Sequence, residues 1–410
     1  MPGRDARNLL DQIQLALDRD IRGADLRRRA TQMLVKLCCQ WNMLPPSLFV
    51  RRARRIGSDP VSCGGFADIF KGTLGSRLVA LKRIRIHATQ TAEQKRKIHT
   101  SLCREAIPWR QLRHPNVLPF LGIDCETAAP HWICLVSPWV RYGDIMHYIE
   151  TRQLVFDDVH RLMLEVASGL QYLHSQHLVH GDLRGANILI DENHHALLAD
   201  FGLISWTMAT GTAGTTDGHG AYRWMAPELL RPPRAGHPFQ RTPASDMYAF
   251  ACTFVEVCTR QPPYWHITHD VTVASLIING ERIARPSANF MWTGDDFSDE
   301  LWHILESCLS EPPLRPSAAD VVRFMQACSA NTSVSAEVSV SGTTKDLRAQ
   351  LELLRSYLAK HSDPGRHNAF SRANHCLIYG VSEAVPTLQR IQATSPEPKR
   401  EAGQSWRQPP

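Results

Sequence analysis

Short apolar runs and apolar residues at helical spacing follow one another along the chain. Residues 79–86 and 132–136 are runs of mostly apolar side chains, which predict strands. Residues 159–173 carry apolar side chains at helical spacing, and residues 247–257 are apolar nearly all round, which is typical of a buried helix. Because strands come first and helices later, the pattern favours two lobes rather than one alternating sheet.

The N-terminal region also shows helical spacing. Residues 5–42 alternate charged and apolar side chains, and two prolines at 45–46 end this pattern. Three apolar side chains are expected on one stripe, namely Leu9, Ile13 and Leu17. The four arginines within residues 51–55 are either a solvated surface or a patch for nuclear import or phosphate binding. We predict a helical N-terminal extension with a basic linker over residues 1–53.

The composition changes again after residue 328. Residues 329–343 are rich in Ser, Thr, Val and Gly, and the last residues are rich in Pro and charged side chains, which is typical of disorder. Between them, four leucines predict a short amphipathic helix at about 344–361, too short for a convincing coiled coil. We therefore predict an ordered domain over residues 54–328 and a mostly disordered tail over residues 329–410.

Composition and charge exclude several classes of protein. With 43% hydrophobic and 21% charged residues, the chain is not wholly disordered, and its net charge of +6 over 410 residues does not demand a nucleic-acid partner. The 11 cysteines lack zinc-site spacing, which favours free thiols in a reducing compartment. The charged N-terminus does not resemble a signal peptide, and no window reaches the roughly 18 apolar residues of a membrane span. We expect a cytoplasmic protein, with a nuclear location as the alternative.

Two carboxylates and an amide mark a candidate site. Asp182 and Asn187 lie five residues apart on a loop that follows a predicted helix and precedes an apolar run. Asp200 ends the next apolar run, eighteen residues after Asp182, so one short hairpin would bring the two carboxylates together. Carboxylate and carboxamide oxygens are hard ligands that suit Mg²⁺, and one carboxylate can instead serve as a base.

A lysine lies late in the first predicted strand. The sequence Val79-Ala80-Leu81-Lys82 places Lys82 among apolar residues, and a buried lysine is costly without a partner. Glu105, in a predicted helix, is the candidate counter-charge.

These motifs, in this order, resemble the eukaryotic protein kinase domain. The resemblance rests on the lysine of the first strand, the helix glutamate, the catalytic loop, the magnesium aspartate and the end of the activation segment: Lys82, Glu105, His180 to Asn187, Asp200, and Ala226 to Glu228. Arg315 resembles the arginine that pairs with Glu228. Residues 114–122 and 222–230 look like the tyrosine-kinase-like group.

The resemblance covers about residues 54–328 and implies a bilobal α+β fold. It implies a β-rich N-lobe at about 54–136 with one regulatory helix, a hinge, and a helical C-lobe at about 141–328. The hinge is expected at residues 137–140, with Ser137 as the gatekeeper.

The same resemblance implies ATP as co-substrate, Mg²⁺ as cofactor and a protein as substrate. Lys82, oriented by Glu105, is expected to hold the α and β phosphates, and Asn187 and Asp200 are expected to bind Mg²⁺. Asp182 is expected to orient the attacking hydroxyl and take its proton, and Arg184 to neutralise charge on the transferred phosphate. The ATP-binding positions that the resemblance implies are Gly64, Gly65, Ile69, Ala80, Lys82, Ser137, Val140 and Leu189.

Three departures from the family pattern affect the predicted activity. Only Gly64 remains of the three glycines in the phosphate-covering loop, which predicts weakened ATP binding. Gly181 replaces the arginine of the catalytic loop, so activation by phosphorylation should matter less. Pro108 lies three residues after Glu105, where a proline is expected to kink or end the helix, and this puts the pairing of Glu105 with Lys82 in question.

Three functions stay open at this point. The first is an active ATP-dependent protein kinase in intracellular signalling, and the second is a pseudokinase that acts as a nucleotide-binding scaffold. The third is a kinase-fold enzyme acting on a small molecule.

The identity of the hydroxyl acceptor is also open. Arg184 and Ala221 stand where serine/threonine kinases usually have Lys and Thr, and the catalytic loop also resembles that of some tyrosine kinases. Residues 220–228 are closest to the tyrosine-kinase-like group, whose members mostly modify Ser and Thr. We predict Ser/Thr specificity, with a tyrosine or dual-specificity kinase as the alternative.

Overall fold

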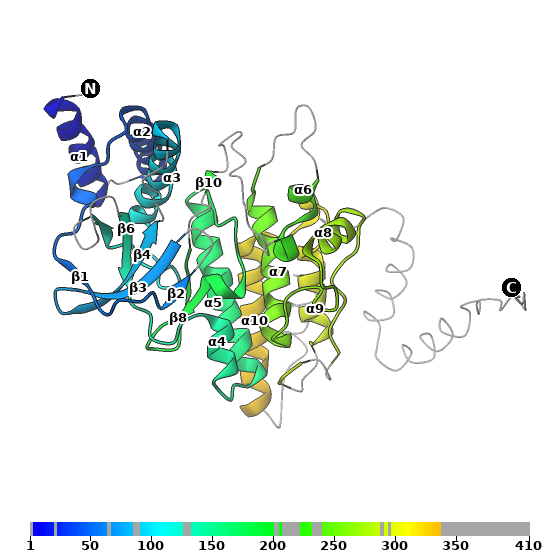
Figure 1. Cartoon of the computed structure of the whole chain (residues 1–410). Coiled ribbons are helices and arrows are strands. Elements are labelled where there is room, and N and C mark those ends of the chain that lie inside the picture. Colours follow the sequence, from blue (N-terminus) through cyan, green and yellow to red (C-terminus); the bar gives the residue numbers. More distant parts are fainter. Residues whose placement is uncertain are drawn as a thin grey trace, which may run out of the picture. The chain divides into compact units, whose positions relative to one another are not determined.

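Six strands in the first half of the chain form one antiparallel sheet, drawn in blue to cyan in Figure 1. The structure is a computed structural model of the chain. It describes residues 3–19, 23–63, 67–84, 91–125, 133–200, 205–206, 222–231, 240–287, 291–293 and 297–337. Gly64, Gly65, Ala221 and the helix expected at about 344–361 therefore lie outside the described residues.

The sheet follows from the alternation of its side chains. Its strands are β1 (Ala53–Arg55), β2 (Ser62–Cys63), β3 (Ala67–Leu74), β4 (Arg77–Ile84), β5 (Gly122–Asp124) and β6 (Ile133–Pro138). The strand order is β1-β3-β4-β6-β5, with β2 paired to β3. Alternate residues of these strands form one apolar cluster that includes Phe70, Val79, Leu81 and Val136. The residues between them face the opposite side of the sheet.

Three long helices belong to this N-terminal part. They are α1 (Arg4–Asp18), α2 (Ala24–Trp41) and α3 (Ala92–Gln111). Figure 1 shows α2 beside α3, and the two helices are packed together. The predicted stripe is only partly right, because Leu9 is 48% exposed whereas Leu10 and Leu17 are buried. Arg110 of α3 forms an ion pair with Asp18 at 3.1 Å.

Helix α3 does not end or break at Pro108, contrary to the expectation from sequence. Thr91 caps the helix through a reciprocal pair of hydrogen bonds with Gln94, and Pro108 lies inside the helix, four residues before Leu112. A proline removes one helical hydrogen bond, but tertiary contacts here hold the turn that follows. Trp109 donates to the carbonyl of Leu118 at 2.7 Å, and Arg110 donates to the carbonyl of Leu121 at 3.1 Å.

Helices dominate the second half of the chain. They are α4 (Ile145–Glu150), α5 (Phe156–Ser175), α6 (Pro227–Leu230), α7 (Pro243–Thr259), α8 (Asp270–Ile278), α9 (Asp299–Cys308) and α10 (Ala318–Glu337). Short strands accompany them: β7 (Leu178–Val179), β8 (Ile188–Ile190), β9 (Ala196–Leu198) and β10 (Ser205–Trp206). The predicted buried helix is α7, whose residues from Ser245 to Cys258 are all buried. The bilobal α+β fold, with a β-rich lobe followed by a helical lobe, is confirmed.

Helix α10 continues to Glu337, beyond the predicted domain end at residue 328. Helix α10 packs against α5, and its Val321 and Met325 are buried. A helix that has been nucleated gains one hydrogen bond for each further residue, and Ala327 and Ala330 favour this extension.

Among the described residues, no helix is long and apolar enough to cross a bilayer.

Gly169 determines how closely α5 approaches β9. A Cβ atom at residue 169 would lie 2.8 Å from the carbonyl oxygen of Asn116 and 2.8 Å from a methyl group of Leu198. That carbonyl already accepts the N–H of Leu198 at 3.0 Å, so the backbone cannot yield cheaply. The absence of a side chain at residue 169 therefore positions β9, which leads directly to Asp200.

We expect Gly169→Ala to destabilise the protein by about 1–3 kcal/mol, because the clash outweighs the better helix propensity of alanine. Chemical denaturation measures the change, and Ser168→Ala on the same helix serves as the control. Equal stability of the two variants would show that α5 can move away from β9 without cost.

Candidate active site

One face of the sheet carries four of the predicted ATP-binding residues. Lys82 pairs with Ile69 on one side, and Ala80 pairs with Ser137 on the other. Directly opposed residues of an antiparallel sheet point to the same face, and so do residues two apart on one strand. Ile69, Ala80, Lys82 and Ser137 therefore share the face opposite to the apolar cluster, and Ser137 is buried there.

The segment after β6 joins this face to the helical lobe. Val140 is buried two residues after β6, and Leu189 lies in β8. The N–H of Tyr142 donates to the carbonyl of Ile190 at 3.2 Å, which ties the segment of Val140 to the strand of Leu189. Six of the eight predicted ATP-binding positions thus lie on connected elements. The other two, Gly64 and Gly65, lie outside the described residues.

Lys82 lies between two carboxylates from separate elements. Its Nζ is 3.5 Å from Oε1 of Glu105 on α3, and it also forms an ion pair with Asp200. The pairing that Pro108 put in question is therefore present.

These three charges shift one another's pKa values. Burial would lower the pKa of Lys82, but the carboxylates of Glu105 and Asp200 outweigh it and raise this pKa. Burial would raise the pKa of Asp200, but the charge and hydrogen bond of Lys82 outweigh it, so this pKa is lowered. Burial raises the pKa of Glu105, with Lys82 opposing the shift. Lys82 is thus held as a cation and Asp200 as an anion.

The loop with Asp182 and Asn187 is tied to itself and to Asp200. The side-chain amide of Asn187 donates to the carbonyl of Asp182 at 2.7 Å and to its carboxylate at 3.0 Å. The N–H of Ala199 donates to the carbonyl of Asn187 at 2.9 Å. Strands β8 and β9 pair as the expected hairpin, with Ile188 opposite Leu198. Asp182, Asn187 and the strand leading to Asp200 are therefore joined as the sequence predicted.

Asp200 adopts a backbone conformation that few non-glycine residues adopt. Its φ angle is 60°, in the left-handed region that costs a non-glycine residue roughly 1–2 kcal/mol. Such strain persists only where the surrounding contacts determine the backbone, and it is concentrated at functional sites. Here Lys82 holds the side chain, and Nε2 of His180 lies 3.0 Å from the carbonyl oxygen of Ala199 in the preceding peptide.

Two residues of this site have oxygens that suit a magnesium ion. Because the amide nitrogen of Asn187 is engaged with Asp182, its carbonyl oxygen is left as the acceptor. The carboxylate of Asp200 is ionised, and Mg²⁺ typically takes one or two protein ligands together with substrate phosphates. Arg184, the remaining predicted residue, has its Nε 3.8 Å from the carboxylate of Asp182.

The catalytic loop depends on two acidic residues of α7 whose part in the site the sequence did not reveal. Asp246 is buried and accepts the backbone N–H groups of His180 and Gly181, both at 2.8 Å. Gly181 has a φ of +81°, which glycine tolerates where the family's arginine would be strained. Glu256 accepts the N–H of Gly185 at 2.8 Å. A buried carboxylate is costly without hydrogen-bond donors. The two acidic residues within the apolar run of α7 were therefore the sequence signal from which these contacts could have been predicted.

The segment at 222–231 is fixed against the same helices. The indole N–H of Trp224 donates to Glu256 at 2.9 Å. Arg315 forms a two-pronged ion pair with Glu228, at 2.6 and 2.9 Å, as the sequence predicted.

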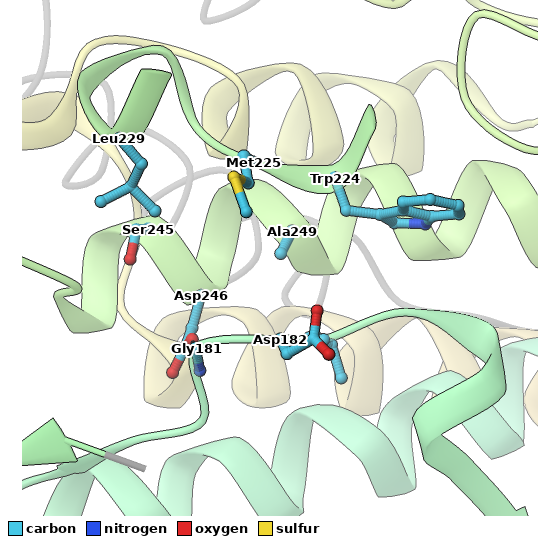
Figure 2. A pocket seen from close by; sticks show the side chains of 9 residues that line it. Gly181, Asp182, Trp224, Met225, Leu229, Ser245, Asp246 and Ala249 are labelled. Carbon is cyan, nitrogen blue, oxygen red and sulfur yellow. The ribbon is translucent and has the colours of Figure 1, made fainter. Parts of the chain in front are cut away.

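A pocket lies between this segment and Asp182. Figure 2 shows Gly181 and Asp182 on one side of it, and Trp224, Met225 and Leu229 on the other. Ser245, Asp246 and Ala249 of α7 complete its wall in Figure 2, together with Leu183. The carboxylate of Asp182 thus lies beside a partly apolar surface.

Comparison with known proteins agrees with this geometry. The family model described as "Protein tyrosine and serine/threonine kinase" matches residues 57–325. The chain is 29% identical to Serine/threonine-protein kinase STY17 of Arabidopsis thaliana over 273 residues, which cover 65% of this chain and 43% of that protein. It is 27% identical to Serine/threonine/tyrosine-protein kinase HT1 of the same plant over 267 residues, covering 64% of this chain and 63% of that one.

A mammalian relative aligns over a longer part of the chain. Serine/threonine-protein kinase TNNI3K of Mus musculus is 27% identical over 333 residues, covering 78% of this chain and 37% of that protein. The chain therefore spans less than two thirds of the length of each of these three relatives.

Glu256 gives the stability of the site a dependence on pH. Burial raises the pKa of Glu256 to about 7, from 4.5, while its bonds to Gly185 and Trp224 oppose the shift. Because the folded-state pKa is the higher one, the folded protein favours the protonated carboxyl. The resulting stability is fully present below pH 4.5 and is lost as the pH rises through about 7.

We expect Glu256→Gln to remove this pH dependence. Between pH 5 and pH 8, the free energy of unfolding of the wild type should fall by about 2–3 kcal/mol more than that of the variant. Denaturant titrations across this range measure it, with Glu300→Gln, an exposed position on α9, as the control. Parallel curves for wild type and Glu256→Gln would contradict a raised pKa.

Proposed function

The chain belongs to the protein tyrosine and serine/threonine kinase family, and from that premise we propose that it is an active protein kinase that uses ATP and Mg²⁺ and phosphorylates Ser and Thr in proteins. The observation that carries the proposal is the ion pairing of Lys82 with both Glu105 and Asp200. This arrangement places the ammonium group of Lys82 beside the ionised carboxylate of Asp200. Both lie next to the sheet face that carries the predicted ATP-binding residues.

Phosphoryl transfer needs positioning and charge neutralisation more than covalent catalysis, and the site offers both. Lys82 would hold phosphate oxygens, with its position fixed by Glu105. Asp200 and Asn187 would hold Mg²⁺, which neutralises the charge on the phosphates when bound. Asp182, steadied by Asn187, would orient the attacking hydroxyl and accept its proton, a contribution of roughly 10²–10⁴-fold. Arg184 would add a positive charge beside Asp182.

The pocket beside Asp182 supports a protein rather than a small molecule as substrate. Met225, Leu229 and Leu183 give it apolar walls, and the pair of Arg315 with Glu228 fixes the segment that carries two of them. A peptide that presents its hydroxyl to Asp182 would lay a neighbouring side chain against this surface. A small polar substrate would make no use of such a surface.

The intact charge cluster also favours activity over a scaffolding role. The strongest argument for a pseudokinase was that Pro108 would prevent Glu105 from reaching Lys82, and the structure has the two residues paired. The loop with Gly64 lies outside the described residues, so its effect on ATP affinity stays a prediction.

A dual-specificity kinase is the second candidate. Two of the three relatives described above are named serine/threonine kinases, and the third, HT1, is named a serine/threonine/tyrosine kinase. Arg184 stands where serine/threonine kinases usually carry lysine, and this feature favours the second candidate. The match of residues 222–230 to the tyrosine-kinase-like group supports Ser/Thr as the main acceptors.

We expect the purified chain to transfer labelled phosphate from ATP in the presence of Mg²⁺, either to itself or to a generic protein substrate. Asp200→Asn should lower this transfer by about 100-fold or more, because it removes the negative carboxylate that would hold the Mg²⁺ ion on the phosphates. Acid hydrolysis of the product should yield mainly phosphoserine and phosphothreonine.

Asp157→Asn is the matched control, since it makes the same chemical change at an exposed position on α5. Transfer by Asp200→Asn at the rate of this control would overturn the assignment of Asp200. Phosphotyrosine as the dominant product would overturn the specificity. No transfer by the folded wild type would favour the pseudokinase.

A further inference from the structure

Three cysteines from two helices come together outside the active site. Cys38 and Cys39 lie in α2, and Cys103 lies in α3. Cys38 and Cys103 are buried, whereas Cys39 is half-buried. The thiol of Cys103 lies close enough to the thiols of Cys38 and Cys39 to interact with both. The helices that carry these thiols are packed together, as Figure 1 shows, so the contact is a part of the fold.

The thiols of Cys39 and Cys103 have different surroundings. The thiol of Cys39 also contacts the carbonyl oxygen of Thr100, at 4.0 Å, and lies in the field of Arg104. The sulfur of Cys103 is 3.5 Å from Nδ1 of His99, one turn earlier on α3. Burial lowers the pKa of His99, so its imidazole is neutral at physiological pH and able to accept a proton.

Chemically, the cluster pairs an accessible thiolate with a protonated thiol. The hydrogen bond from Cys103 lowers the pKa of Cys39 to about 7, against the opposing effect of burial, with help from Arg104. The bonds to Cys38 and Cys39, together with burial, raise the pKa of Cys103. Oxidants attack the thiolate and need access to it, and Cys39 meets both conditions. A second thiol in contact is what resolves the oxidised product.

We propose that Cys39 and Cys103 form a peroxide-sensitive thiol pair, which closes to a disulfide that links the N-terminal helix α2 to α3. Nothing in the kinase reaction uses these residues. Hydrogen peroxide is the oxidant, and Cys38 is a buried bystander.

The reaction balances in two steps. The thiolate of Cys39 attacks one oxygen of hydrogen peroxide, breaks the O–O bond, and yields a sulfenic acid and hydroxide. Cys103 then loses its proton, with His99 as the nearby acceptor, and its sulfur attacks the sulfur of the sulfenic acid, from which hydroxide leaves. In sum, two thiols and one hydrogen peroxide give one disulfide and two waters, with the peroxide reduced by two electrons.

The location of the link gives it a consequence for the kinase fold. Cys103 lies two residues before Glu105 on α3, the helix that brings Glu105 to Lys82. A disulfide would tie this helix covalently to α2, and it would constrain the unfolded chain between residues 39 and 103. The oxidised protein is therefore expected to unfold at a higher temperature than the reduced protein.

Non-reducing peptide mapping of the full chain tests the proposal. Reduced protein is treated with a small excess of hydrogen peroxide, blocked with N-ethylmaleimide and digested. The expected product is a peptide pair from α2 and α3, lighter by two hydrogens and separated by dithiothreitol. It should be lost in Cys39→Ser and kept in Cys38→Ser, which is the matched control one position away.

A second measurement covers the case in which a variant folds poorly. In the wild type, the alkylation rate of Cys39 should be half-maximal near pH 7. In Cys103→Ser the midpoint for Cys39 should move upward, because the bond from Cys103 is lost. Cross-linking that persists in Cys39→Ser, or an alkylation midpoint for Cys39 that does not move in Cys103→Ser, would overturn the proposal.

Discussion

A single ammonium group held between two carboxylates is the interaction on which the site depends. Lys82 comes from β4, Glu105 from α3 and Asp200 from the end of the β8–β9 hairpin. A lysine in this position would be costly if unpaired, since burial disfavours its charge. Its two partners make the charge stable, and the same contacts fix the positions of α3 and of Asp200. The sheet, helix α3 and the β8–β9 hairpin are thereby joined at one point.

Helix α7 holds the catalytic loop in place beside this cluster. It is buried almost throughout, and its two acidic side chains bind backbone N–H groups of the catalytic loop: Asp246 holds His180 and Gly181, and Glu256 holds Gly185. These bonds orient the loop without occupying its functional groups. Glu256 extends the support to Trp224 and hence to the wall of the pocket beside Asp182. The rigid helix thus positions both the reacting groups and the surface for the substrate.

The sequence predicted much of this arrangement, and its failures have physical causes. Motif order predicted that Lys82, Glu105 and Asp200 share one site with Asn187 beside Asp182, and the structure brings these side chains together, while their roles stay predictions. The local rule for Pro108 did not predict the end of the helix, because hydrogen bonds from Trp109 and Arg110 to the segment before β5 offset the one that is lost. Composition alone does not register that a packed helix can extend past residue 328, as α10 does. The thiol cluster depends on the packing of α2 against α3, which helical periodicity alone does not determine.

The most direct test of the charge cluster is a double-mutant cycle on the rate of phosphoryl transfer. The variants are Lys82→Met, Glu105→Gln and the two combined, and kcat/KM is measured with saturating Mg²⁺. If Glu105 acts by holding Lys82, its loss should cost little once Lys82 is gone, so the double variant should be about as slow as Lys82→Met alone. Fully additive losses of activation free energy would contradict a cluster that acts as one unit.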